Sequence, residues 1–143
     1  MRRYLSPVVT VVCCLSLLNY LISCNDDDGP SAEQIRLQEH SATWALGSVT
    51  NDGNDVTSQF TGFSLSIDQF SFTTENGGNA WPTSGTYSFI ENDLDRLQRS
   101  DGVEITIDAI NNDDLSLSFQ VSTLPGGRTA GITGNFIFSL VTQ

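Results

Sequence analysis

Few side chains in this sequence have the types and spacing that catalysis requires. His40 is the only histidine, and no nucleophile-elbow sequence supplies a serine for a triad built on it. One histidine, with no cysteine free to join it, also falls short of a zinc site. His40 follows Glu39 near the end of an expected helix, where we interpret it as a solvated or capping residue. The sequence therefore predicts no catalytic residue, no metal and no cofactor, and we expect a protein that is not an enzyme.

Carboxylates lie close together in two short segments, Asp113-Asp114 and residues 91–95. Glycosidase chemistry needs two carboxylates facing each other across a cleft, about 5–9.5 Å apart. These acids fall in expected turns, so we interpret them as solvated turn residues. The oxygen-rich run 51–55, Asn-Asp-Gly-Asn-Asp, is a second kind of candidate because calcium takes oxygen ligands. It lacks the EF-hand spacing, and the same residue types dominate plain turns.

Three arginines are candidates for contacting a ligand carboxylate: Arg96, Arg99 and Arg128. We expect each of them instead to pair with one of the many acids, and exposed ion pairs of that kind contribute little to stability.

Aromatic residues are the main candidates for binding. Trp81 lies with Pro82 in a long loop, where an exposed ring could hold a sugar or a partner protein. Alternatively, Trp81 caps the mouth of the fold as part of the core, where we also place Trp44. A ligand cavity would be lined by some of the remaining rings: Phe63, Phe72, Tyr87, Phe89, Phe119 and Phe136.

From Thr43 onward, apolar residues alternate with Ser- and Thr-rich positions, a period typical of half-buried antiparallel strands. We expect eight strands, at about 42–49, 60–67, 70–75, 85–90, 95–100, 103–109, 114–122 and 131–142. Asp101-Gly102 is a two-residue hairpin signal. Short connections favour an up-and-down order, and pairing of the first strand with the last would remove both exposed edges. The fold class is thus all-β, an eight-stranded antiparallel up-and-down barrel.

One short helix is expected before the strands, from Ser31 to about Ser41. Ser31 can cap it, and Glu33-Gln34 occupy its first turn. Its apolar content is thin, so we expect a plug or lid on the barrel or a frayed linker.

The first 23 residues have the parts of a secretory signal: Met1-Arg2-Arg3, a mostly apolar stretch from Tyr4 to Ile22, and the small residue Ser23. The junction Leu21-Ile22-Ser23-Cys24 resembles a bacterial lipobox. That resemblance implies that Cys24 is the lipidated N-terminus of the mature protein, carrying fatty-acyl chains such as palmitate. An uncleaved anchor, or cleavage without lipidation, remains open. The run Asp26-Asp27-Asp28 is similar to the export signal of surface lipoproteins in Bacteroidetes, or is a solvated tether.

The mature chain would be strongly acidic. It would carry four arginines, no lysine and seventeen acids, a formal charge of 4 − 17 = −13. Nucleic acid is therefore a poor partner, because phosphate binding needs clustered cations. Cys13 and Cys14 fall in the removed segment, so no disulfide is expected. The domain organisation predicted is a signal peptide (1–23), an acidic tether and short helix (24–41), and one barrel domain (42–143).

The strand sequences resemble lipocalin-like lipoprotein domains of the Bacteroidetes type. The resemblance rests on Trp44-Ala45-Leu46, Phe63-Ser64-Leu65, residues 84–89, residues 115–119 and residues 131–138. It implies a calycin-like barrel on a lipid anchor in the bacterial cell envelope, attached to the outer membrane and facing either the periplasm or the cell surface. We expect a non-catalytic barrel that binds a small apolar ligand or glycan. The alternative is a structural or protein-interaction module with a solid barrel, accessory to an outer-membrane complex. A cavity favours the first, and interdigitated rings favour the second.

Overall fold

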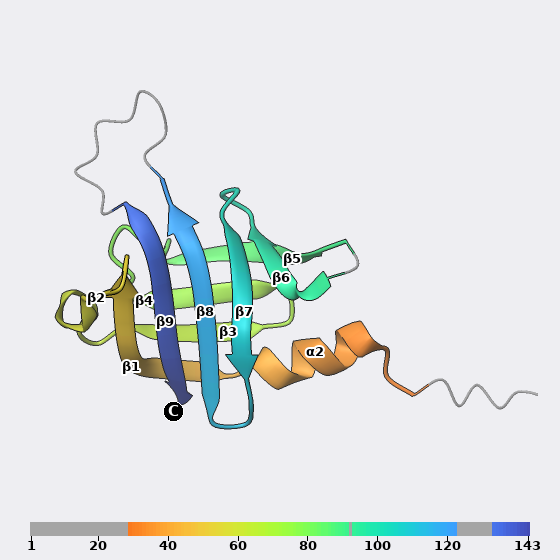
Figure 1. The fold of residues 1–143 in the computed structure, drawn as a ribbon. Helices are drawn as coiled ribbons and strands as arrows, with labels where there is room; N and C mark the ends of the chain where they lie inside the picture. Colours follow the sequence, from red (N-terminus) through yellow and green to blue (C-terminus); the bar gives the residue numbers. More distant parts are fainter. Residues whose placement is uncertain (1–28, 92, 123–132) are drawn as a thin grey trace, which may run out of the picture.

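The computed structural model describes residues 29–91, 93–122 and 133–143. The signal segment, Cys24, the acidic run and Arg128 lie outside these residues. Eight antiparallel strands close into a barrel, in the order β1-β3-β4-β5-β6-β7-β8-β9 with β9 paired to β1 (Figure 1). The barrel strands are β1 (Thr43–Asn51), β3 (Ser64–Asp68), β4 (Ser71–Glu75), β5 (Ser84–Ile90), β6 (Asp93–Arg99), β7 (Glu104–Ile110), β8 (Asp114–Val121) and β9 (Gly134–Thr142). The expected fold class and strand order are confirmed.

Closure depends on β1, which pairs with β3 through Thr43–Ala45 and with β9 along most of its length. A register shift between Leu46 and Ser48 bends the strand between these two partners. Gly47 lies at this bulge, and a Cβ atom there would approach the carbonyl oxygen of Ser139 to 2.8 Å. Because Gly47 has no side chain, β1 and β9 can approach each other closely at the bend.

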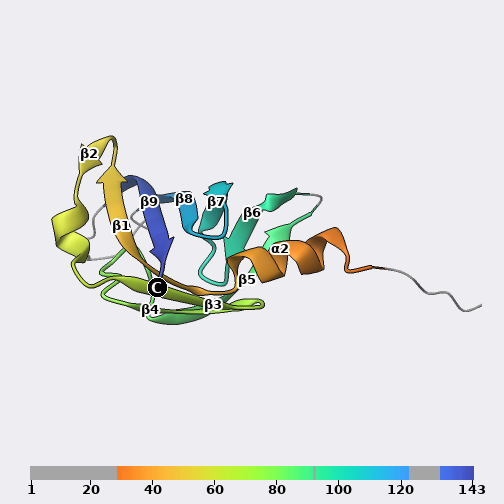
Figure 2. The same ribbon diagram turned by 90° about the horizontal axis from the view of Figure 1, so that it is seen from below.

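Helix α2 (Ala32–His40) precedes the barrel, within one residue of the bounds expected. Ser31 and Gln34 form a capping box: Gln34 N donates to Ser31 Oγ, and Ser31 N donates to Gln34 Oε1. Most of the helix is exposed, and it projects from one end of the barrel (Figure 2). Its terminal residue, His40, is nevertheless buried. We call this the α2 end of the barrel.

Two elements between β1 and β3 were not expected. Residues 54–55 form the short strand β2 (Asn54–Asp55), which pairs back on the end of β1. The 3-10 helix η2 (Thr57–Phe60) then occupies the start of the segment predicted as the second strand. That strand, β3, begins only at Ser64.

The hairpin at Asp101-Gly102 differs from the two-residue loop that was expected. Arg99 N bonds to Val103 O, so the loop has three residues. Gly102 takes the positive φ that such a loop requires.

Inward and outward positions alternate as the sequence pattern predicts. In β8, Leu115, Leu117 and Phe119 are buried while the residues between them remain accessible. Because the chain runs up and down, alternate connections gather at each end. The end opposite α2 carries the β1–β2 turn, η2, residues 76–83 and the β6–β7 hairpin, and we call it the loop end.

Candidate functional site

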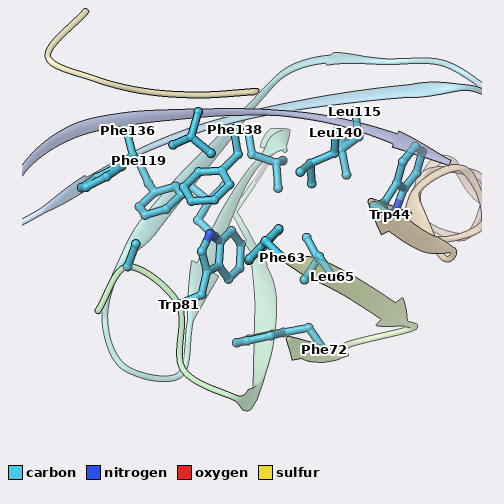
Figure 3. Close-up of a cluster of buried hydrophobic side chains, with 14 of the residues drawn as sticks. Trp44, Phe63, Leu65, Phe72, Trp81, Leu115, Phe119, Phe136, Phe138 and Leu140 are labelled. Carbon is cyan, nitrogen blue, oxygen red and sulfur yellow. The ribbon is translucent and has the colours of Figure 1, made fainter. Parts of the chain in front are cut away.

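The interior of the barrel at the loop end is filled with aromatic rings. Trp81 reaches in from the loop after β4 and contacts the other rings edge-on, with its ring centroid 5.2 Å from Phe119, 5.7 Å from Phe72 and 6.0 Å from Phe138. Figure 3 shows Trp81 between the Phe119–Phe138 layer and Phe72, with Trp44 at the other end of the cluster. Only 4% of Trp81 is exposed, so of its two interpretations the geometry favours the core residue.

The local backbone explains why Trp81 turns inward. The N–H groups of Ala80 and Trp81 both donate to the carbonyl oxygen of Gly77, which folds residues 77–81 into a tight turn. A Cβ atom on Gly77 would lie 2.6 Å from the Cβ of Trp81, so this turn requires glycine there. Thr74 Oγ1 donates to Pro82 O at 2.7 Å and fastens the returning chain to β4. The conformation of this loop therefore directs the indole ring of Trp81 into the barrel.

Arg99 lies beneath this loop, and its side chain is buried. Its guanidinium lies 4.8 Å from the centre of the Trp81 ring and donates to the carbonyl oxygen of Ala80 at 3.0 Å. Two further donor groups form a forked ion pair with the carboxylate of Asp101. The expectation of an exposed, weakly paired arginine is wrong for Arg99. It is correct for Arg96, whose pair with Glu104 lies on the surface.

The Asp101 carboxylate neutralises the positive charge of the buried Arg99 side chain. Partial burial raises the pKa of Asp101, but the Arg99 hydrogen bond and charge, together with the Val103 N–H group, outweigh it, so the pKa lies below its ordinary value. The carboxylate is therefore ionised at neutral pH. This cluster connects the β6–β7 hairpin to the loop that carries Trp81.

We expect Asp101→Asn to lower the free energy of unfolding by about 1–3 kcal/mol, because a buried guanidinium would lose its counter-charge. Glu104→Gln on the same hairpin is the matched control and should change stability by less than about 0.5 kcal/mol, since its pair with Arg96 is exposed. Urea denaturation of the three proteins at neutral pH checks this. Equal stability of the two variants would contradict the structural role of Asp101.

His40 occupies the α2 end, where only 1% of the residue is exposed. Its Nε2 lies 2.6 Å from the hydroxyl oxygen of Tyr87, and that hydroxyl donates its own proton to the carbonyl oxygen of Gln69. Since Tyr87 has only one proton to give, we assign the hydrogen to His40 Nε2, which leaves Nδ1 as an acceptor. The indole N–H of Trp44 donates to the His40 carbonyl oxygen at 3.0 Å. The interpretation of His40 as a solvated residue is wrong: it closes the barrel.

The electrostatics of this end keep both partners neutral. Burial lowers the pKa of His40 to about 4, assisted by the positive charge of Arg36 and opposed by the Arg36 backbone carbonyl. Burial also raises the pKa of Tyr87, and the nearby carboxylate of Asp68 adds to that shift. Among the described residues, no donor lies within hydrogen-bonding geometry of His40 Nδ1. A neutral histidine and a neutral tyrosine thus meet inside the α2 end of the barrel.

The space left between the two ends is very small. It measures about 20 Å³, as the volume available to the centre of a water molecule. Aliphatic side chains of Leu65, Leu97, Ile105 and Leu115 surround it, between Trp81 and His40. By this measure one water needs about 10–15 Å³, so the void holds roughly one. Ligand sites for small molecules usually occupy about 300–1,000 Å³.

The seven residues predicted to line a ligand cavity all belong to this filled interior. Phe63, Phe72, Trp81, Tyr87, Phe119 and Phe136 are buried, and Phe89 packs against them in a partly buried position.

An open groove of about 850 Å³ borders the loop end, beside Arg99 and Val121. It reaches Ser122, where the described part of the chain breaks off.

The other candidate residues serve local turns. Asp52 Oδ1 accepts from the backbone N–H of Asn135, and Asp55 Oδ1 accepts from that of Thr57. The Asp55 bond lies within the turn and the Asp52 bond fastens the turn to the start of β9, so both favour the turn interpretation of residues 51–55. At the β7–β8 turn, Asn111 Oδ1 accepts from the backbone N–H groups of both Asp113 and Asp114. Over the residues with described positions, no group of three or more His, Cys, Asp or Glu side chains converges as a metal site would require.

The fold and its interior define a class: an all-β protein with one closed antiparallel barrel, filled by its own side chains and plugged by a helix terminus. The chain matches no protein-family model and none of the curated proteins. Within the described ranges, no helix is both long and apolar enough to cross a membrane.

Proposed function

We propose that this chain is a lipid-anchored, non-catalytic protein of the bacterial envelope whose lipocalin-like barrel serves as a solid interaction module, accessory to an outer-membrane complex. The filled interior is the observation that carries the proposal. Four rings pack around Trp81, those of Phe72, Phe119 and Phe138 edge to face and that of Phe63 tilted, and the void left over holds about one water. A barrel of this kind acts through its surface.

Under this proposal the two ends of the barrel have different roles, one toward the membrane and one toward a partner protein. The chain enters through Pro30 and α2, so an anchor at Cys24 would hold the α2 end near the bilayer. The loop end, with η2 and residues 76–83, then points away from the membrane toward a partner. Binding residues on loops carried by a rigid scaffold are a common arrangement.

Site-specific photo-crosslinking in the native envelope tests this division. A photoreactive residue at Gln59, exposed on η2, should give a discrete crosslinked product with a partner protein. The same residue at Asn112, exposed in the β7–β8 turn at the α2 end, is the matched control and should give none. Identical patterns from both positions, or no product from Gln59, would count against a docking function of the loop end.

The anchor has its own test. Cells expressing the full chain are fed a clickable fatty acid, and the wild-type protein should take up the label. Cys24→Ala should lose it and leave the membrane fraction, because its thiol is the acylation site under this proposal. Equal labelling of the two proteins would refute lipidation at Cys24.

Binding of a small apolar ligand or glycan is the second candidate, and one observation favours it. His40 lines the apolar void, and its buried Nδ1 has no hydrogen-bond partner among the described residues, so a molecule with a hydroxyl group could bind there. That function requires the wild-type barrel to expand. The Trp81 experiment in the Discussion separates the two candidates.

A further inference from the structure

Helix α2 is attached to the barrel mainly at its last residue. Residues 32–35 are exposed, Arg36 and Leu37 are half-buried, and His40 is fully covered. A second attachment is the ion pair of Arg36 with Asp95 on β6, at 2.6 Å. The Asp95 side chain is more than half exposed, so this pair contributes little. The helix therefore depends on His40 to stay in place.

The helix and the strands depend on this attachment to very different degrees. α2 has nine residues, and isolated helices shorter than about 12–15 residues are marginal in water. A detached α2 would therefore unfold. The strands close without it, because β9 pairs with β1 along most of its length and with β8 from Asp114 to Val121. The α2 end can open while the barrel remains intact.

The hydrogen bonds of His40 fit only the neutral ring. Nε2 donates to the hydroxyl oxygen of Tyr87, which in turn donates to the carbonyl oxygen of Gln69. A second proton would go to Nδ1, which has no hydrogen-bond partner among the described residues. Protonation would thus bury an N–H group without an acceptor, together with an unpaired charge, and both are unfavourable.

The charged groups around His40 do not offset a second proton. On α2 itself, the positive charge of Arg36 opposes it. The two carboxylates nearest that arginine, Glu39 on the helix and Asp95 on β6, are already paired with the guanidinium. From the end of β3, the Asp68 carboxylate acts on the tyrosine hydroxyl. A charged His40 is therefore more stable in water than in the barrel.

We propose that α2 is an acid-released latch: uptake of a proton by His40 detaches the helix while the strands of the barrel stay closed. Burial holds the pKa of His40 at about 4 in the attached state, and exposure returns it to about 6.5. The opening equilibrium should therefore rise roughly fifty-fold between pH 7 and pH 4.5. Since His40 lines the interior void, its departure exposes the apolar interior at the α2 end. Neither the lipid anchor nor a partner protein enters this inference.

Hydrogen exchange of the full-length protein, followed by mass spectrometry, tests the latch. Peptides that cover α2 and β8 are compared at pH 7 and pH 4.5, with labelling times scaled for the pH dependence of free amides. In acid, α2 should exchange about fifty-fold faster relative to free amides, and β8 should keep its protection. His40→Gln retains every carboxylate but cannot take up the proton, so its α2 should stay protected at both pH values.

A permanent charge at the same position separates the trigger from the acid. His40→Lys should release α2 already at pH 7 and leave β8 protected. Gln38→Lys adds the same charge at an exposed position of the same helix, and this matched control should keep α2 protected. Loss of protection in α2 and β8 together, equal behaviour of wild type and His40→Gln, or an α2 that stays protected in acid would overturn the proposal.

Discussion

Trp81→Ala is expected to lower the free energy of unfolding by about 3–5 kcal/mol and to make the protein bind indole. The substitution removes the ring at the centre of the aromatic layer, where Phe63, Phe72, Phe119 and Phe138 all contact it. Phe72, Phe119 and Phe138 belong to strands of the closed barrel and Phe63 directly precedes β3, so these neighbours cannot collapse fully into the space. An apolar cavity should remain, of the shape that indole fills.

Urea denaturation with and without indole measures both effects. Indole should raise the stability of Trp81→Ala and leave the wild type unchanged. Phe70→Ala, which truncates an aromatic residue that is 40% exposed, is the control and should cost less than about 1 kcal/mol. If Trp81→Ala does not fold, Trp81→Leu leaves a smaller cavity and can be tested with benzene.

The wild-type arm of this experiment bears on function. A wild-type barrel that indole or a longer apolar molecule stabilises as strongly as the variant would contradict a solid interior. It would favour the ligand-binding candidate over the interaction module. No stabilisation of the wild type supports the module.

The second large effect is a loss of stability in acid that depends on His40. Its pKa is about 4 in the folded protein and about 6.5 in an unfolded chain, so the unfolded state takes up the proton first. Stability from neutral His40 is therefore complete above pH 6.5 and is lost as the pH falls toward 4. A shift of this size corresponds to about 3 kcal/mol over that window.

Denaturation of wild type and His40→Gln at a series of pH values isolates this contribution. Arg36 and Tyr87, which act on His40, and Asp68, which acts on Tyr87, are present in both proteins, and so are all the carboxylates. The difference in stability between the two proteins should shrink between pH 6.5 and 4. Parallel curves would show that His40 is not buried. Because His40 is the only histidine, its ring proton signals in an untagged protein give the pKa directly.

The strands and their inward faces could be predicted from the sequence because burial on one side imposes a period of two. Leu115, Leu117 and Phe119 illustrate this, and so does the capping box at Ser31. The segment 57–63 does not alternate. Phe60 and Phe63 are three residues apart, which fits the turn of η2 better than a strand.

Two polar residues of the interior were missed for a common reason. Arg99 has the same parity as the inward Leu97, yet its charge suggested the surface. Its burial depends on Asp101 and Ala80, which reach it through a turn and a loop. His40 lies four residues before Trp44, whose indole N–H donates to its carbonyl oxygen. The burial of the His40 side chain depends on Tyr87, which is 47 residues away in the sequence. The alternation of inward and outward positions in β6 could have indicated that Arg99 points inward. The hydrogen bonds that bury Arg99 and His40 join residues far apart in the sequence, and the sequence alone does not show them.

The double pairing of β1 has a mechanical consequence. A pull on the chain before α2 reaches β1 through His40, where the Trp44 indole and the Tyr87 hydroxyl bond to the helix terminus. The load then runs along β1, whose hydrogen bonds to β3 and β9 lie across the direction of pull. Bonds loaded in this way share the force and break together rather than one at a time. The strand that closes the barrel is therefore also the strand best placed to withstand tension from the N-terminal side.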